Sequence, residues 1–139
     1  MKIFFDTNIL LDVLLKREKL FEGSAKVWSL SNVKKIHGYI SAISVNNLYY
    51  IINKLKDRRT AEQFVEQILT DFHIISLTEV VLKNAHRNSS VDFKDMIQYY
   101  SAINAKCSFL LTRNISDFPK SNLKIITPEK FIEQFTQKL

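Results

Sequence analysis

The chain has 139 residues, of which 46% are hydrophobic and 24% are charged, and its formal net charge is +6 at pH 7. This apolar content excludes an intrinsically disordered chain, and the length suits one domain, which we place at residues 1–139. No apolar run reaches the roughly 18 residues of a membrane-spanning helix, and the single cysteine, Cys107, excludes an internal disulfide. We therefore expect a cytoplasmic protein without membrane association, whose positive charge favours a partner made of phosphates.

Strand-like and helix-like segments alternate along the chain. The first segment, Lys2–Phe5, is almost entirely apolar, which is typical of a parallel strand covered on both faces. This alternation predicts an α/β layered fold around a mostly parallel sheet. The other predicted strands are 39–43, 73–77, 108–111 and 124–126. The predicted helices are 7–16, 20–34, 45–55 with Ser44 as N-cap, 58–71, 79–88, 93–105 and one starting at 127–129, and 88–90 is a predicted loop.

Three aspartates fall near strand ends that this fold would bring together. Asp6 ends the first strand, Asp95 lies in the first turn of the helix before the fourth strand, and Asp117 follows that strand. In an open α/β sheet, ligands bind beyond the carboxyl ends of the strands, at the point where the strand order reverses. Clustered carboxylates repel one another, so we expect a divalent cation among them, and oxygen ligands favour Mg²⁺ or Mn²⁺. Such an ion suits phosphodiester hydrolysis.

Each of these aspartates also has a purely structural interpretation. Asp6 precedes a predicted helix and could be its N-cap. Asp92 and Asp95 are three residues apart and face the same way, so one could cap the helix while the other only favours its positive end. We assign Asp92 to the cap and Asp95 to the metal site.

Three segments, Phe5–Asp12, Asp92–Met96 and Leu111–Phe118, resemble the PIN domain family in order and spacing. The resemblance covers the whole chain and implies a three-layer α/β/α sandwich with a central, mostly parallel five-stranded sheet. It also implies a metal-dependent endoribonuclease, a VapC-like toxin that acts on RNA and is paired with an antitoxin protein. A homodimer is compatible with it, through the apolar faces around Trp28 and Tyr49. The implied metal-binding catalytic acids are Asp6, Asp95 and Asp117, and Asn8, Thr112 and Asn114 would support them by hydrogen bonds.

One position departs from the family's pattern. PIN domains usually carry a glutamate in the helix after the second strand, and this chain has Asn47 there. An amide can offer an oxygen to a cation or to water, but it supplies neither negative charge nor a base. A second interpretation is therefore a catalytically silent PIN-like module that binds RNA or a protein partner. A phosphatase with Asp6 as nucleophile is disfavoured, because Asn8 stands where haloacid-dehalogenase-like phosphatases carry a second aspartate.

Basic and aromatic residues complete the candidate site. Arg113 adjoins the proposed acids, and because arginine suits bidentate phosphate contacts we predict that it binds substrate. Tyr49 and Tyr50 could stack on bases, but on a mostly apolar helix we place them in the core. We interpret one basic cluster as a solvated helix end: Lys54, Lys56, Arg58 and Arg59.

Overall fold

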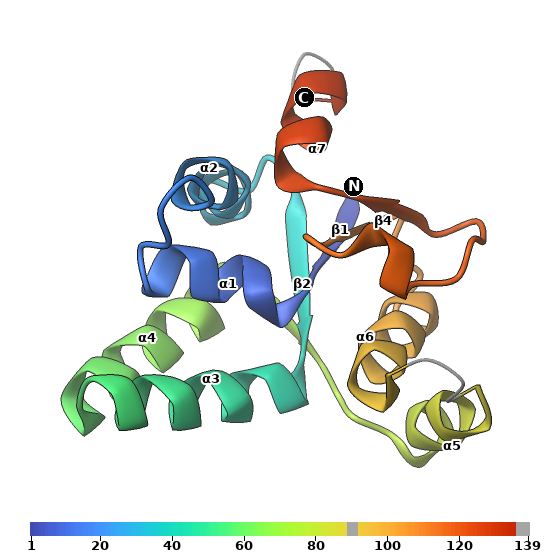
Figure 1. The fold of residues 1–139 in the computed structure, drawn as a ribbon, viewed down its shortest axis with the longest axis horizontal. Coiled ribbons are helices and arrows are strands. Elements are labelled where there is room, and N and C mark those ends of the chain that lie inside the picture. Colours follow the sequence, from blue (N-terminus) through green and yellow to red (C-terminus); the bar gives the residue numbers. More distant parts are fainter. Residues whose placement is uncertain (89–91, 136–139) are drawn as a thin grey trace.

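Five short parallel strands form the central sheet of the protein in a computed structural model that describes residues 1–88 and 92–135 (Figure 1). Most of the predicted loop at 88–90 lies outside the described residues. The strand order is β3-β2-β1-β4-β5, so β2 and β3 lie on one side of β1, and the chain then crosses to the other side to form β4 and β5. This reversal makes the carboxyl ends of β1 and β4 a switch point, where α/β sheets bind ligands. The strands are β1 (Lys2–Phe5), β2 (His37–Ser41), β3 (His73–Ile75), β4 (Phe109–Leu111) and β5 (Lys124–Ile126).

Side chains of β1 alternate between two apolar cores, one on each face of the sheet. Ile3 and Phe5 enter the first core, Phe4 enters the second, and all three are wholly buried. Each such burial stabilises the fold by about 1.5–3 kcal/mol. Helices α1–α4 and α7 contribute to the first core, and α5 and α6 cover the other face (Figure 1). The helices are α1 (Thr7–Leu14), α2 (Phe21–Asn32), α3 (Ala42–Leu55), α4 (Arg58–Asp71), α5 (Glu79–Arg87), α6 (Phe93–Asn104) and α7 (Pro128–Phe135), with a 3₁₀ turn, η1 (Ile115–Asp117).

This layered, fully parallel arrangement confirms the predicted fold class. None of the helices in the described part of the chain is long and apolar enough to cross a membrane.

Asp92 is the N-cap of α6, as its place in the sequence predicts. Its carboxylate accepts hydrogen bonds from the backbone amides of Lys94, at 2.8 Å, and Asp95, at 3.2 Å. Two of the amides that every helix leaves unpaired at its start are thereby satisfied. The side chain of Asp95 is therefore not needed for capping and can serve the pocket described below.

The boundary between β2 and α3 differs from the sequence-based prediction. The strand ends at Ser41, whose hydroxyl accepts a hydrogen bond from the backbone of Ile43 at 3.4 Å, and the helix begins at Ala42. The prediction that Ser44 caps this helix is therefore wrong. A short apolar run such as Tyr39–Ile43 does not distinguish a strand from the first turn of a buried helix. The shift moves Ser44 into the helix, where it is buried and its hydroxyl lies 2.7 Å from that of Thr7.

Candidate active site

A pocket of about 380 Å³ opens where β1 ends, between α1, α3 and α6. Four residues predicted from the sequence line it: Asp6 and Asn8 from the start of α1, Asn47 from α3, and Asp95 from α6. These side chains come from three distant parts of the sequence and meet at the switch point of the sheet. The remaining lining residues are Thr7, Leu11, Tyr50, Ile51, Lys94 and Gln98.

The carboxylate of Asp6 is oriented by a hydrogen bond from Thr112, and the backbone of Thr7 and Asn8 at the start of α1 also helps to lower its pKa. The Asp6 backbone occupies the N-cap position of α1, but its side chain makes no capping hydrogen bond to this fully described helix. Instead, the wholly buried hydroxyl of Thr112 donates to Asp6 Oδ2 at 2.9 Å. Burial raises the pKa of Asp6, and the Thr112 hydrogen bond partly offsets that rise. The arrangement holds a desolvated carboxylate at the floor of the pocket.

Asp95 is half-buried on the opposite wall, and its pKa is raised to about 6. Burial is the largest cause, followed by the negative charges of Asp6, Asp92 and Asp117. Asp6 and Asp95 thus repel each other across the pocket, and a cation between them would relieve that repulsion. With the amide of Asn47 beside them, the site offers an oxygen-only donor set, which suits a hard divalent ion such as Mg²⁺ or Mn²⁺.

Asp117 lies at the margin of this arrangement. It is exposed, belongs to η1, and is not one of the described residues that line the pocket. Its charge still contributes to the raised pKa of Asp95. Within residues 1–88 and 92–135, however, no three acidic, histidine or cysteine side chains stand close enough to hold one metal ion together. The structure therefore brings Asp6, Asp95 and Asn47 to one pocket and leaves Asp117 as an exposed carboxylate beside it.

Asn114 supports the segment after β4 through its backbone. The backbone N–H of Asn114 donates to the hydroxyl of Thr112 at 3.1 Å, and its backbone carbonyl accepts from the backbone N–H of Asp117 at 3.0 Å. Thr112 thus links the acid at the pocket floor to the turn that carries Asp117.

The guanidinium of Arg113 is held by protein groups outside the pocket. Its Nε donates to Asp12 at 3.0 Å, its Nη2 donates to Ser24 Oγ at 2.8 Å and to the carbonyl of Leu20 at 3.0 Å, and its Nη1 donates to Glu129. Burial alone would lower the pKa of Arg113, but Glu129 and Asp12 raise it. Arg113 thus ties the segment after β4 to α1, α2 and α7, and the substrate contact expected from the sequence stays a prediction.

A polar cluster beneath the pocket was not anticipated from the sequence. Gln98 is 6% exposed, and its Nε2 donates to Thr7 Oγ1 and Ser44 Oγ, both at 3.1 Å. The cluster joins the pocket-facing parts of α1, α3 and α6. One signal was present, because Gln98 lies three residues after Asp95 and therefore on the same face of its helix.

The two tyrosines of α3 have different environments. Tyr49 packs against the first core, as expected, whereas Tyr50 is 62% exposed on the pocket wall, so its predicted core position is wrong. Trp28 is only 7% exposed, and its Nε1 donates to Asp71 at 2.6 Å. Trp28 lines a shallow depression together with Val13, Leu14 and Phe64, and the dimer through the faces around Trp28 and Tyr49 stays a prediction.

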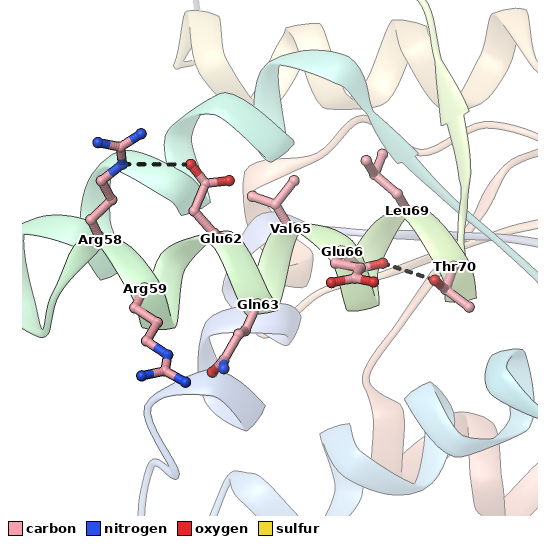
Figure 2. A pocket seen from close by; sticks show the side chains of 8 residues that line it. All are labelled: Arg58, Arg59, Glu62, Gln63, Val65, Glu66, Leu69 and Thr70. Carbon is pink, nitrogen blue, oxygen red and sulfur yellow. Dashed lines mark hydrogen bonds and ion pairs between the residues drawn. The ribbon is translucent and has the colours of Figure 1, made fainter.

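Two members of the basic cluster, Arg58 and Arg59, are exposed at the start of α4, whereas Lys54 belongs to the last turn of α3. Figure 2 shows the side chain of Arg58 on the same side of this helix as Glu62, to which it is paired at 3.9 Å, and the side chain of Arg59 on the other side. The depression there is lined by α4 alone, and the convex face of a single helix cannot enclose a ligand. These residues fit a solvated helix end.

Comparisons with known proteins agree with this architecture. The chain is 22% identical to Ribonuclease VapC1 of Aquifex aeolicus (strain VF5), over 96% of this chain and 95% of that protein. The toxin VapC20 of Mycobacterium tuberculosis, described as cleaving the sarcin–ricin loop, superposes with a TM-score of 0.65 at 13% identity, over 78% of this chain and 86% of that one.

Two solved complexes with DNA also contain chains whose fold is similar to that of this protein. DNA-bound VapBC from Salmonella typhimurium gives a TM-score of 0.71 at 16% identity, over 92% of this chain and 98% of that one. VapBC2 from Rickettsia felis, bound to a promoter DNA fragment, gives a TM-score of 0.68 at 19% identity, over 90% of this chain and 97% of that one. These likenesses concern the fold. The sequence itself matches the PIN domain over residues 2–116, and the chain belongs to the PIN domain family.

Proposed function

We propose that the protein is a metal-dependent endoribonuclease that cleaves RNA phosphodiester bonds, and that it is the toxin of a toxin–antitoxin pair. The pocket at the switch point of the sheet carries this proposal, because Asp6, Asp95 and Asn47 converge there in a PIN-domain fold. The related Aquifex protein is a ribonuclease, which favours RNA as the substrate.

Asp6 and Asp95 would hold a Mg²⁺ or Mn²⁺ ion together with the amide oxygen of Asn47, and the carboxylate of Asp117 would add its negative charge from the margin of the pocket. When bound, such an ion supplies charge neutralisation at a scissile phosphate and activation of water. The residues of the chain prepare the site: Thr112 keeps Asp6 oriented, and the amide of Asn47 is able to orient water.

Lys94 adds a cation to the lining of the same pocket. Its ammonium group can pair with a backbone phosphate next to the one being cleaved. The +6 net charge of the chain favours the approach of RNA in the same way, although over a longer range.

The second candidate function is a silent PIN module that binds RNA or a protein without cleavage. Asn47 favours it, because a neutral side chain stands on the pocket wall where the family usually has an acid. The cation site then has one negative charge fewer, and its affinity for a divalent ion falls.

A cleavage assay distinguishes the two functions. Wild type and Asp95→Asn are incubated with mixed structured and single-stranded RNA in Mg²⁺, Mn²⁺ or chelator. The matched control is Glu66→Gln, which removes a carboxylate from the outer face of α4 (Figure 2). Metal-dependent cleavage by wild type and Glu66→Gln, but not by Asp95→Asn, supports the nuclease. RNA binding without cleavage in either metal supports the silent module.

The antitoxin is a separate part of the proposal. Structures that share this fold include toxin–antitoxin complexes from several bacteria. We expect a protein encoded beside this gene to co-purify with the chain and to suppress its cleavage of RNA. Full cleavage activity in the presence of that bound protein would contradict the toxin–antitoxin assignment.

A further inference from the structure

Tyr50 is an exposed aromatic residue on the wall of the acidic pocket. Its side chain is 62% exposed, and it shares this pocket with Asn47, Asp95 and Lys94. Among the described residues, neither apolar core includes its ring, whereas Tyr49 beside it packs against the first core. Packing in the two apolar cores therefore does not explain an aromatic ring at this position.

The residues of α3 form an ordered track that leads away from the acids. Asn47, Tyr50 and Lys54 follow at intervals of three and four residues, which places them along one face of the helix. The helical rise puts about 10 Å between the two ends of this track. Lys54 Nζ lies 5.9 Å from the centre of the Tyr50 ring. An amide beside the acids is thus followed by an exposed ring and then by a cation.

This order matches the chemistry of a single RNA strand. Its phosphates would meet the acid site at one end and Lys54 at the other, and the base between them would meet the ring of Tyr50. A base in a duplex is already stacked between its neighbours and cannot reach such a ring without leaving the helix. Stacking on an aromatic side chain strengthens binding by roughly fivefold to a hundredfold per base.

We propose that Tyr50 is the stacking platform for an unpaired base next to the scissile phosphate, so that the site takes RNA with an unpaired nucleotide at the cut. This inference rests on the proposed function and adds a specificity-determining residue to it. Lys54 belongs to the same subsite, where it pairs with the phosphate beyond the stacked base.

Binding is measured in an Asp95→Asn background with Mg²⁺, which separates stacking from cleavage. The probes are a short mixed-sequence single-stranded RNA carrying 2-aminopurine and the same sequence as a duplex. We expect single-strand affinity to fall at least about fivefold in Tyr50→Ala and to persist in Tyr50→Phe. The 2-aminopurine quenching that reports stacking should disappear only in Tyr50→Ala.

Leu55→Ala is the matched control, because Leu55 is also 62% exposed on α3 but does not line the pocket. It should bind both probes as its parent does. An unchanged melting temperature in Tyr50→Ala would show that the loss does not come from misfolding. In the active protein, the same substitution should raise KM for single-stranded RNA more than it lowers kcat, because stacking is made in the ground state as well.

Three results would overturn the inference. If Tyr50→Ala binds and quenches the single strand as its parent does, or if the duplex binds as tightly as the single strand, Tyr50 is not a stacking platform. Cleavage of RNA by wild type in that case would leave the proposed function standing. If wild type neither cleaves nor binds RNA, the proposed function fails and the inference fails with it.

Discussion

Arg113 donates from Nε to the fully buried carboxylate of Asp12 at 3.0 Å, which joins the segment after β4 to the C-terminal half of α1. Asp12 also accepts from Ser24 Oγ at 2.8 Å, and its other oxygen lies 3.4 Å from Arg17. Because Thr112 precedes Arg113 directly, this ion pair also fixes the residue that orients Asp6 at the pocket floor. The pair therefore holds two sides of the candidate active site in register.

We expect Arg113→Ala to destabilise the protein by about 3–5 kcal/mol, because it leaves the carboxylate of Asp12 buried without its main counter-charge. Arg113→Lys should restore only part of the stability lost in Arg113→Ala, since an ammonium group cannot reproduce the forked contacts to Asp12, Ser24 and Glu129. Urea unfolding measures both variants. Arg59→Ala, on the outer face of α4 in Figure 2, is the control and should lie within about 0.5 kcal/mol of wild type. Unchanged stability with lost RNA affinity in Arg113→Ala would instead make this arginine a substrate contact.

Thr112→Val should weaken metal binding by roughly tenfold to a hundredfold, because the methyl group cannot donate to Asp6 and no longer orients its carboxylate. Titration of Mn²⁺ by calorimetry measures the change. Thr70→Val is the matched control, because the Thr70 hydroxyl donates within its own helix, to the carbonyl of Glu66 at 2.9 Å. Equal Mn²⁺ affinities in the two variants would argue that Asp6 does not bind the ion.

Asn47→Glu should tighten Mn²⁺ binding by about tenfold or more, since it adds a third carboxylate to the pocket. Without metal the same change should lower the melting temperature at neutral pH, because the new charge repels Asp6 and Asp95. Added Mg²⁺ should restore the melting temperature. Asn46→Glu places the same charge on the exposed side of α3. This control is expected neither to tighten Mn²⁺ binding nor to lower the melting temperature. A metal affinity that stays unchanged in Asn47→Glu would place the cation elsewhere.

Asp71 should make the protein sensitive to acid. Burial alone would raise its pKa, but hydrogen bonds from Asn32, Gln67 and Trp28 outweigh burial and lower it. A carboxyl group whose pKa is lowered on folding stabilises the native state above its unfolded pKa of about 3.9, and this stabilisation is lost as the pH falls through the folded value. Wild type should therefore lose stability on acidification below about pH 4.

Asp71→Asn tests this assignment. It should be less stable than wild type at neutral pH by about 1–3 kcal/mol, because its amide turns a donor toward the donors around it. It should also lose less stability in acid. The emission of Trp28, the single tryptophan of the chain, follows both transitions because its indole contacts Asp71 directly. Parallel acid transitions in the two proteins would assign the acid sensitivity to other groups.

Local rules in the sequence determined much of this protein. The apolar run before Asp6 specified a buried strand, and Asp92 three residues before Asp95 specified a capped helix, because capping and hydrophobic periodicity act within a few residues. The alternation of strands and helices then specified a parallel sheet and the edge at which Asp6 and Asp95 would meet. The assignment of Asp6, Asp95 and Asp117 as metal ligands stays a prediction.

Only the tertiary structure decided which elements face one another. Arg113 and Asp12 are 101 positions apart, and no local pattern indicates that one would neutralise the other. Tertiary packing also decided the exposure of Tyr50, because helical periodicity shows which residues share a face of a helix but not what covers that face. The sequence therefore predicted that Asp6 and Asp95 would lie close together, while the packing of α1, α3 and α6 decided that the ring of Tyr50 is exposed beside them and that Arg113 is already paired with Asp12.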